Sequence, residues 1–200
     1  MATHEPENPS GSFRLTARLC MGACHAPRPP DPNSLPDRLS YNGRMHIRPF
    51  EPRDQSAARQ LILNGLGEHF GWIDEMRNPD LDDIAAHYLA RGHVFVVAEP
   101  HPGGELTGAG ALLVGLEDGG QIVRMSVAPA HRRHGLGREL VHHLVEAARQ
   151  RRLRRVIVET NNDWYDPIRL YQRCGFSEYH RDEESVYLSL SLIPTRQDGG

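Results

Sequence analysis

The chain contains no lysine, so all 23 of its Lys and Arg residues are arginine. A phosphate-binding loop of the form G-x-x-x-x-G-K-[ST] is therefore excluded. The exclusive use of arginine indicates a high-GC coding bias, which is typical of a GC-rich bacterial source. The net charge is −3, and this argues against a protein that binds nucleic acid mainly by electrostatic attraction.

Cysteine and long apolar runs are also scarce. The three cysteines (Cys20, Cys24 and Cys174) are too few for a disulfide framework, which favours a reducing, cytoplasmic environment. Cys20 and Cys24 have no second pair of ligands nearby in the sequence, so we expect no metal site. No apolar stretch approaches the ~20 residues that span a bilayer, so we expect a soluble protein that does not contact a membrane.

Composition divides the chain into a leader, a domain and a tail. Residues 1–44 are rich in proline, arginine and small polar residues and show no regular periodicity. We expect them to be a disordered leader or an over-extended start of the chain. An apolar strand pattern opens at Met45, and residues 45–193 have the length of a single domain. We expect residues 194–200 to form a flexible tail.

Hydrophobic periodicity predicts a mixed α/β domain, in the α+β sense, with helices on both faces of one sheet. A first strand from Met45 is followed by a helix from Asp54 to Asn64-Gly65. A second helix is expected from Asn78-Pro79, with its inward face formed by Leu81, Ile84, Ala85, Tyr88 and Leu89. The remaining expected elements are strands at 93–99, 106–116 and 121–127, a helix from 136, a strand at 156–159, a helix between 166 and 175, and a hairpin of 176–180 and 186–192.

A basic glycine loop between a strand and a helix is the most informative motif. Residues 132–137 read Arg-Arg-His-Gly-Leu-Gly, and apolar residues recur at helical spacing from Leu136. A helix N-terminus carries backbone N–H groups without intrahelical partners, and Gly135 and Gly137 let an anion approach that backbone. Three arginines add positive charge, namely Arg132, Arg133 and Arg138. The loop predicts a pyrophosphate site, but not the dinucleotide pattern G-x-G-x-x-G, because no third glycine follows.

A second motif follows near the end of the domain. Residues 156–159 (Val-Ile-Val-Glu) form an apolar, β-branched run that is typical of a buried strand. Asp166 and Pro167 are suited to be the N-cap and the first residue of a helix. That helix carries the sequence Leu-Tyr-Gln-Arg-Cys-Gly-Phe at residues 170–176.

The two motifs, in this order, resemble the GNAT superfamily of acetyl-CoA-dependent N-acetyltransferases over about residues 45–193. The resemblance implies a mixed, mostly antiparallel sheet flanked by helices on both faces. It also implies transfer of an acetyl group from acetyl-CoA to a primary amine by direct attack in a ternary complex, without a metal. The residues implied to bind coenzyme A are Met125, Ser126 and Val127, through their backbone, and the loop residues Arg132, Arg133, His134, Gly135, Leu136, Gly137 and Arg138.

The resemblance further implies two catalytic residues. Tyr171 stands where many GNAT enzymes place a tyrosine that protonates or hydrogen-bonds the departing sulfur. Glu159 stands where ribosomal-protein N-terminal acetyltransferases of this superfamily carry a general-base glutamate, and we expect it to be half-buried at a strand end. The alternatives are a core aromatic for Tyr171 and a solvated carboxylate for Glu159. The chain departs from the family pattern at Trp164, where an asparagine is usual, and at Pro167.

No motif identifies the acceptor. The acidic and aromatic side chains between the first two helices suit a cationic amine, and we place Glu68, Phe70 and Trp72 in its pocket, with Trp164 as a wall. A solvated acidic loop with aromatic anchors in the core explains the same residues. A polyamine, an amino acid, an aminoglycoside, a peptide N-terminus and a protein lysine all remain open as acceptors, and so does a homodimer formed through the terminal hairpin.

Two other functions are consistent with parts of the sequence. A GNAT domain that binds acetyl-CoA without catalysis would act as a sensor, although the presence of Tyr171 and Glu159 favours an enzyme. The arginine-rich run at residues 149–155 is typical of some nucleic-acid-binding surfaces. It lies at an expected helix C-terminus, where cations complement the helix dipole, and no aromatic residues accompany it, so a solvated helix end is favoured.

Overall fold

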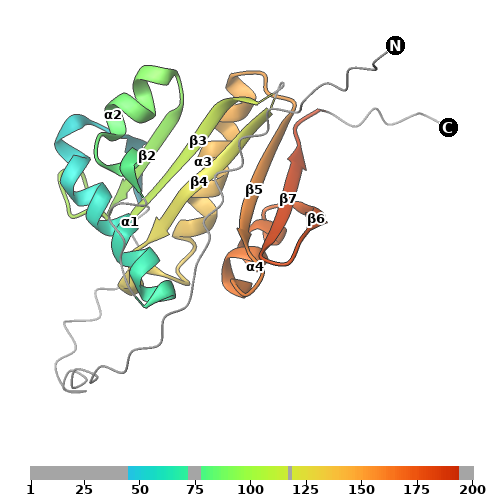
Figure 1. The fold of residues 1–200 in the computed structure, drawn as a ribbon. Helices are drawn as coiled ribbons and strands as arrows, with labels where there is room; N and C mark the ends of the chain where they lie inside the picture. Colours follow the sequence, from blue (N-terminus) through green and yellow to red (C-terminus); the bar gives the residue numbers. More distant parts are fainter. Residues whose placement is uncertain (1–44, 72–77, 117–118, 194–200) are drawn as a thin grey trace, which may run out of the picture. The chain divides into compact units, whose positions relative to one another are not determined.

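The computed structural model describes residues 45–71, 78–116 and 119–193. These residues build one seven-stranded sheet, drawn in Figure 1. The strands are β1 (His46–Pro49), β2 (Val94–Glu99), β3 (Gly108–Leu116), β4 (Gly119–Val127), β5 (Arg155–Asn161), β6 (Ser177–Arg181) and β7 (Ser185–Ser191). Their order across the sheet is β1-β2-β3-β4-β5-β7-β6. Neighbouring strands are antiparallel except β4 and β5, which pair in parallel.

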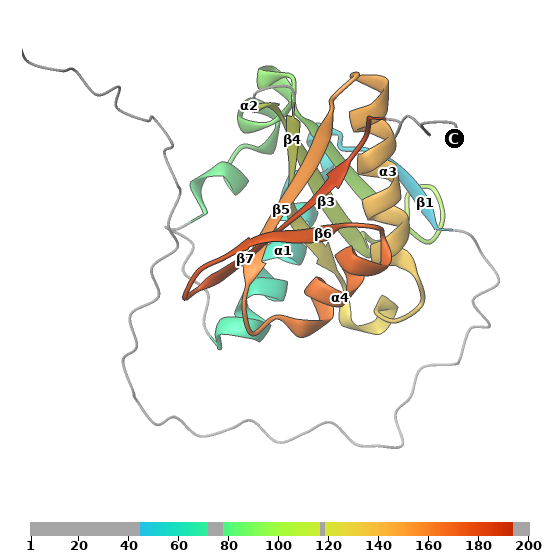
Figure 2. The same cartoon turned by 90° about the vertical axis from the view of Figure 1, so that its right-hand side faces the viewer.

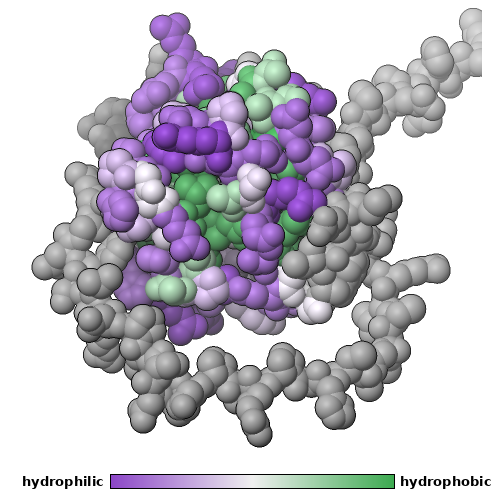
Figure 3. Space-filling model, turned by 90° about the vertical axis from the view of Figure 1, so that its left-hand side faces the viewer, coloured by the Kyte–Doolittle hydropathy of each residue, from purple (hydrophilic) through white to green (hydrophobic). Residues whose placement is uncertain are grey.

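Helices cover both faces of the sheet, which confirms the predicted fold class. They are α1 (Gln55–Phe70), α2 (Ile84–His87), α3 (Leu136–Gln150) and α4 (Tyr165–Arg173). Figure 2 looks onto the face that carries α3 and α4, with α1 behind the sheet. Figure 3 shows the side of the domain on which α1 and α2 lie, where hydrophilic residues surround a smaller hydrophobic area. Within the described part of the chain, no helix is both long enough and apolar enough to cross a membrane.

Two hydrophobic cores lie on opposite faces of the sheet. Because side chains alternate along a strand, Phe95 and Val97 of β2 pack with α1 and α2, whereas Val96 and Ala98 pack with α3. All four side chains are almost fully buried. The continuous apolar run of β2 therefore reflects a strand that is covered on both faces.

Helix α1 is longer than the sequence predicted. It continues past Gly65 to Phe70, and Gly71 ends it in the left-handed conformation (φ 73°). Gly65 has a packing role instead, because a Cβ atom there would lie 2.8 Å from the hydroxyl oxygen of Ser126 on β4. The absence of a side chain at Gly65 lets α1 lie close to the strand.

The predicted second helix is broken into three short pieces. A 3-10 turn (Pro79–Leu81) precedes α2, and a second 3-10 turn (Leu89–Arg91) follows it. The side chain of Gln55 in α1 causes part of this break, because it binds the carbonyl of Leu81 (2.7 Å) and the amide of Ile84 (2.9 Å). Leu81, Ile84 and Tyr88 are buried as predicted and Ala85 is half-buried, but Leu89 is exposed.

A buried ion cluster joins β1, β2 and the turn before α1. Glu99 is only 1% exposed and accepts hydrogen bonds from Arg48 and His46. The guanidinium of Arg48 also donates to both carboxylate oxygens of Asp54, at 2.6 and 2.9 Å. The hydrogen bonds from Arg48 lower the pKa of Glu99 to about 2, against the opposing effect of burial.

Strand β4 contains a β-bulge opposite β3. Ser126 pairs with Ala109 and Val123 with Ala111, so the ladder is irregular between them, and Arg124 adopts a positive φ of 57°. The Arg124 guanidinium donates to Asp80 at 2.5 and 2.9 Å and to the side chain of Asn78 at 2.7 Å. These contacts tie the bulge to the segment that leads into α2.

The Glu99 cluster predicts an acid-dependent loss of stability. A carboxyl group whose folded-state pKa is depressed stabilises the fold above its unfolded pKa, and this contribution is lost as the pH falls through the folded value. We expect the free energy of unfolding, measured with urea, to fall between pH 4.5 and about 2, and to fall less in Glu99→Gln. The exposed Glu105→Gln is the matched control and should retain the pH dependence of the unmodified protein.

The Arg124–Asp80 pair predicts a large local cost for removing one charge. Asp80→Ala leaves a mostly buried guanidinium without its main partner, and we expect a loss of about 3 kcal/mol in the free energy of unfolding. Removing both charges, in Asp80→Asn with Arg124→Met, should recover part of that loss. A change below about 1 kcal/mol in Asp80→Ala would show that the pair behaves like an exposed salt bridge.

Candidate active site

The two parallel strands, β4 and β5, pair over only part of their length and then separate. Pairing between β4 and β5 begins at Gly119 with Arg155 and ends at Ile122 with Val158, although β4 continues to Val127 and β5 to Asn161. Figure 1 shows the two strands separating toward the end at which α4 lies. Beyond Ile122, therefore, β5 provides no backbone partners for β4.

Met125, Ser126 and Val127 lie on the part of β4 that β5 does not pair with. They are half-buried, and their neighbour on the other side is β3. The hydroxyl of Ser126 donates to the carbonyl of Leu61 in α1 (3.1 Å). The side chain of Ser126 thus contacts α1, and the backbone of this segment has no partner from β5.

The backbone of the glycine loop alternates in handedness immediately before α3. Arg133 (φ 64°) and Gly135 (φ 94°) are both left-handed, and α3 begins directly afterwards at Leu136. Such alternation directs successive backbone N–H groups to one side of the chain. A Cβ atom at Gly135 would meet nothing within 4 Å, whereas one at Gly137 would lie 3.2 Å from Leu170 of α4. The first glycine therefore leaves open space for a ligand, and the second allows close packing of α4.

The charged residues of the loop are exposed and contact the neighbouring helices. Arg132 pairs with Glu68 at the end of α1 (2.7 Å) and donates to the carbonyl of Val127 (2.8 Å). Arg133 lies 3.8 Å from Asp166 of α4. His134 and Arg138 are exposed, and Leu136 is buried, so only the backbone of Leu136 is available to a ligand. The loop can thus supply both amide donors and positive charge to a pyrophosphate.

Tyr171 is buried on the face of the sheet that carries α3 and α4. It is 5% exposed, and its ring meets that of Phe176 edge to face, with the centroids 5.6 Å apart. Burial raises the pKa of its phenol well above the ordinary value of 10, so the hydroxyl stays neutral and remains a hydrogen-bond donor. The preceding helix start differs from the prediction, because Trp164 and not Asp166 is the N-cap residue of α4.

Glu159 lies on the opposite face of β5 and is exposed, so the expected burial at a strand end is wrong. The strand continues two residues further to Asn161, and Val158 and Thr160 take the buried side by alternation. Glu159 is the first residue of β5 beyond the last pair with β4. Its carboxylate is therefore next to the point where the strands separate.

The predicted acceptor residues are only partly described. Trp72 lies outside the described residues, and so does the side chain of Phe70, which is the last residue of α1. Glu68 is paired with Arg132 of the glycine loop. Trp164 packs edge to face against His69 of α1, with ring centroids 4.1 Å apart. Glu68 and Trp164 therefore both lie where α1 approaches the glycine loop and the start of α4.

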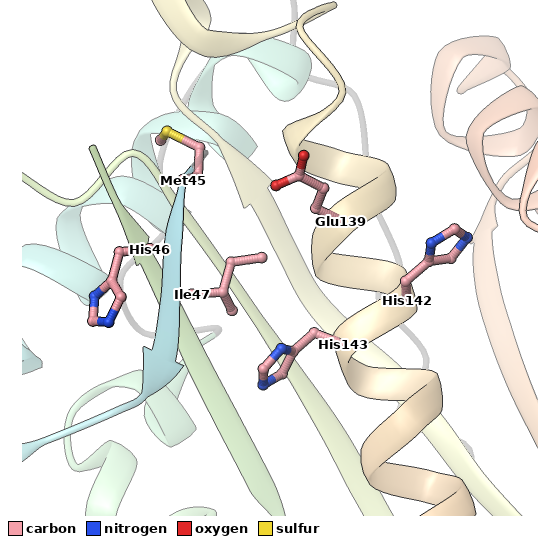
Figure 4. A pocket seen from close by; sticks show the side chains of 6 residues that line it. All are labelled: Met45, His46, Ile47, Glu139, His142 and His143. Atoms are coloured by element: carbon pink, nitrogen blue, oxygen red, sulfur yellow. The ribbon is translucent and has the colours of Figure 1, made fainter. Parts of the chain in front are cut away.

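A groove also lies between β1 and α3. It has a volume of about 480 Å³ and is lined by Met45, His46, Ile47, Glu139, His142 and His143. The imidazoles of His46 and His142 point away from one another (Figure 4). In the described ranges no group of three or more His, Cys, Asp or Glu residues is arranged to hold a metal ion.

The sequence analysis missed several residues around the gap. Arg124 carries the bulge of β4, and a charged residue inside an otherwise apolar strand was the available signal. Ser185 and Tyr187 of β7 both donate hydrogen bonds to Glu159. No sequence signal reveals these two, because their contact with Glu159 depends on the register of β5 against β7.

Comparison with known proteins supports the predicted membership of the GNAT superfamily. Residues 59–176 match the model of the Acetyltransferase (GNAT) family. The chain is 33% identical over 138 residues to glucosamine 6-phosphate N-acetyltransferase 1 of Oryza sativa, covering 66% of this chain and 81% of that protein. It is 28% identical over 156 residues to the uncharacterized N-acetyltransferase YsnE of Bacillus subtilis, covering 74% of this chain and all of that protein.

Solved structures share the fold. A GNAT-family acetyltransferase from Staphylococcus aureus has a TM-score of 0.68 at 18% identity, covering 75% of this chain and 100% of that one. The PaiA N-acetyltransferase of Thermoplasma acidophilum, solved in complex with coenzyme A, has a TM-score of 0.64 at 12% identity. The match covers 74% of this chain and 99% of that chain. The family match, and a fold in which two strands part in front of a glycine loop, lead to the same conclusion: this chain belongs to the GNAT family of acetyltransferases.

Proposed function

We propose that this chain transfers the acetyl group of acetyl-CoA to a primary amine by direct attack in a ternary complex. The observation that carries the proposal is the separation of β4 from β5 beside an anion-binding loop at the N-terminus of α3. A long molecule with a pyrophosphate at one end and a thioester at the other fits these two features together. Its pyrophosphate would meet the amides around Gly135, and its pantetheine arm would pair with the backbone of residues 125–127.

The two proposed catalytic residues lie on opposite faces of the sheet. Tyr171 belongs to the same core as Val158, and Glu159 projects from the other face of β5. A thioester held in the gap between them would present its sulfur toward one face and its carbonyl carbon toward the other. This arrangement suits an in-line reaction in which the amine and the leaving group do not compete for the same space.

The proton balance of the reaction assigns a role to each residue. The amine nitrogen forms a bond to the carbonyl carbon, and the carbon–sulfur bond breaks. Glu159 accepts the proton that the nitrogen must lose, and Tyr171 donates a proton to the departing sulfur. A backbone N–H near Val127 would stabilise the negative charge on the carbonyl oxygen of the tetrahedral intermediate. The products are an N-acetylated amine and coenzyme A as its thiol.

Binding of acetyl-CoA is the first test, by calorimetry on the full chain. We expect Gly135→Glu to weaken binding on the order of 10²-fold or more, because a carboxylate would stand beside the pyrophosphate. Gly92→Glu is the matched control, since Gly92 has the same left-handed backbone (φ 78°) and open surroundings but lies before β2. Equal affinity in Gly135→Glu and the unmodified protein would refute the proposed cradle.

Replacement of Tyr171 tests the proton donor. Tyr171→Phe keeps the ring and its packing against Phe176 but removes the acidic hydrogen. We expect kcat to fall on the order of 10²-fold, while the affinity for acetyl-CoA stays unchanged. Unchanged turnover would remove Tyr171 from the mechanism and leave it as a core aromatic.

The acceptor is found by measuring thiol release from acetyl-CoA in the presence of defined amines. The panel is spermidine, kanamycin, glutamate, glucosamine 6-phosphate and a peptide with a free N-terminal alanine. We expect release of coenzyme A to depend on one class of amine, with the acetylated product detected by mass spectrometry. Tight binding of acetyl-CoA without amine-dependent release for any class would support the sensor function instead.

A further inference from the structure

The Glu159 carboxylate is held by two hydroxyl groups from β7. Tyr187 stands directly opposite Glu159 in the antiparallel ladder, and its hydroxyl lies 3.3 Å from Oε1. Ser185, two residues earlier on the same face of β7, donates to the same oxygen at 3.3 Å. Among the described residues, only Oε1 of Glu159 receives hydrogen bonds, and Oε2 receives none.

Tyr187 is itself fixed in place. A bulge in β6 between Glu178 and His180 sets two residues against it, and its ring lies 5.2 Å from that of His180 and 6.3 Å from that of Tyr179, centroid to centroid. Its single hydroxyl hydrogen is shared between Glu159 Oε1 and Asp182 Oδ2, and Asp182 Oδ2 lies 3.2 Å from the hydroxyl oxygen. Burial and the two carboxylates raise the pKa of Tyr187 to about 12, so its hydroxyl remains a donor at neutral pH.

The turn between β6 and β7 keeps this arrangement together. Asp182 Oδ1 accepts the backbone amides of Glu184 (2.9 Å) and Ser185 (2.8 Å), which fixes the start of β7. The phenol of Tyr187 therefore stands between the turn and Glu159. An exposed glutamate would otherwise sample several rotamers, and two donors on one oxygen reduce that freedom.

We propose that Tyr187 and Ser185 are positioning residues that hold Glu159 in one rotamer and leave Oε2 to accept the proton of the acceptor amine. This inference rests on the proposed function, in which Glu159 is the general base. Neither residue is expected to touch acetyl-CoA, because both act through the carboxylate of Glu159. Their effect should therefore appear in kcat and should require Glu159.

The test is a double-mutant cycle on the full chain, with acetyl-CoA and the amine from the panel above that gives the fastest thiol release. We expect Tyr187→Phe and Ser185→Ala each to lower kcat about fivefold to tenfold, with an unchanged KM for acetyl-CoA. In the Glu159→Gln background, neither substitution should change the remaining rate by more than about twofold, because coupled residues are not additive.

Two matched controls separate positioning from structure. Tyr179→Phe removes the hydroxyl of the tyrosine beside Tyr187, and Ser189→Ala removes a hydroxyl two residues beyond Tyr187 on the same face of β7. Both should keep full activity. Equal losses from Tyr187→Phe in the presence and absence of Glu159 would overturn the inference, as would a matching loss in Tyr179→Phe. Those results would leave the proposed function intact, which fails only if the unmodified protein does not transfer acetyl groups to any amine of the panel.

Discussion

The incomplete pairing of β4 with β5 is the constraint on which the rest of the structure depends. The two strands share only the ladder from Gly119 with Arg155 to Ile122 with Val158, and then each continues without the other. Unpaired backbone groups inside a sheet are costly unless other groups satisfy them, and the proposed function assigns this gap to the amides of the pantetheine arm. Strand β4 also carries a bulge on the side of β3, within the part that β5 does not pair with.

Polar contacts connect the elements that surround the gap. Arg124 in the bulge binds Asp80, which leads into α2, and Ser126 binds the backbone of α1. Arg132 of the glycine loop binds Glu68 at the end of α1. Helix α1 is therefore linked to both β4 and the glycine loop.

The sequence analysis was accurate where one local signal decided the structure. Glycine conformation, helix periodicity and the Leu-Tyr-x-x-x-Gly-Phe pattern located α3 and α4 and the loop before α3. It failed where side chains from distant segments intervened. Gln55 binds backbone groups of Leu81 and Ile84, where the expected second helix is broken. The glycine at position 65 is explained by its close approach to Ser126 and not by the end of a helix. Neither contact has a signal in the surrounding residues.

The sequence by itself determined the family, the fold class and the position of the glycine loop before α3, because short motifs with fixed spacing and strong periodicity encode them locally. The tertiary structure alone decided the environment of each proposed catalytic group. Tyr171 is buried and Glu159 is exposed, and the two residues lie on opposite faces of the sheet. Strand β7 supplies the two hydroxyl groups that contact the Glu159 carboxylate. Burial and cross-strand register depend on which segments pack together, and residues far apart in the chain set both.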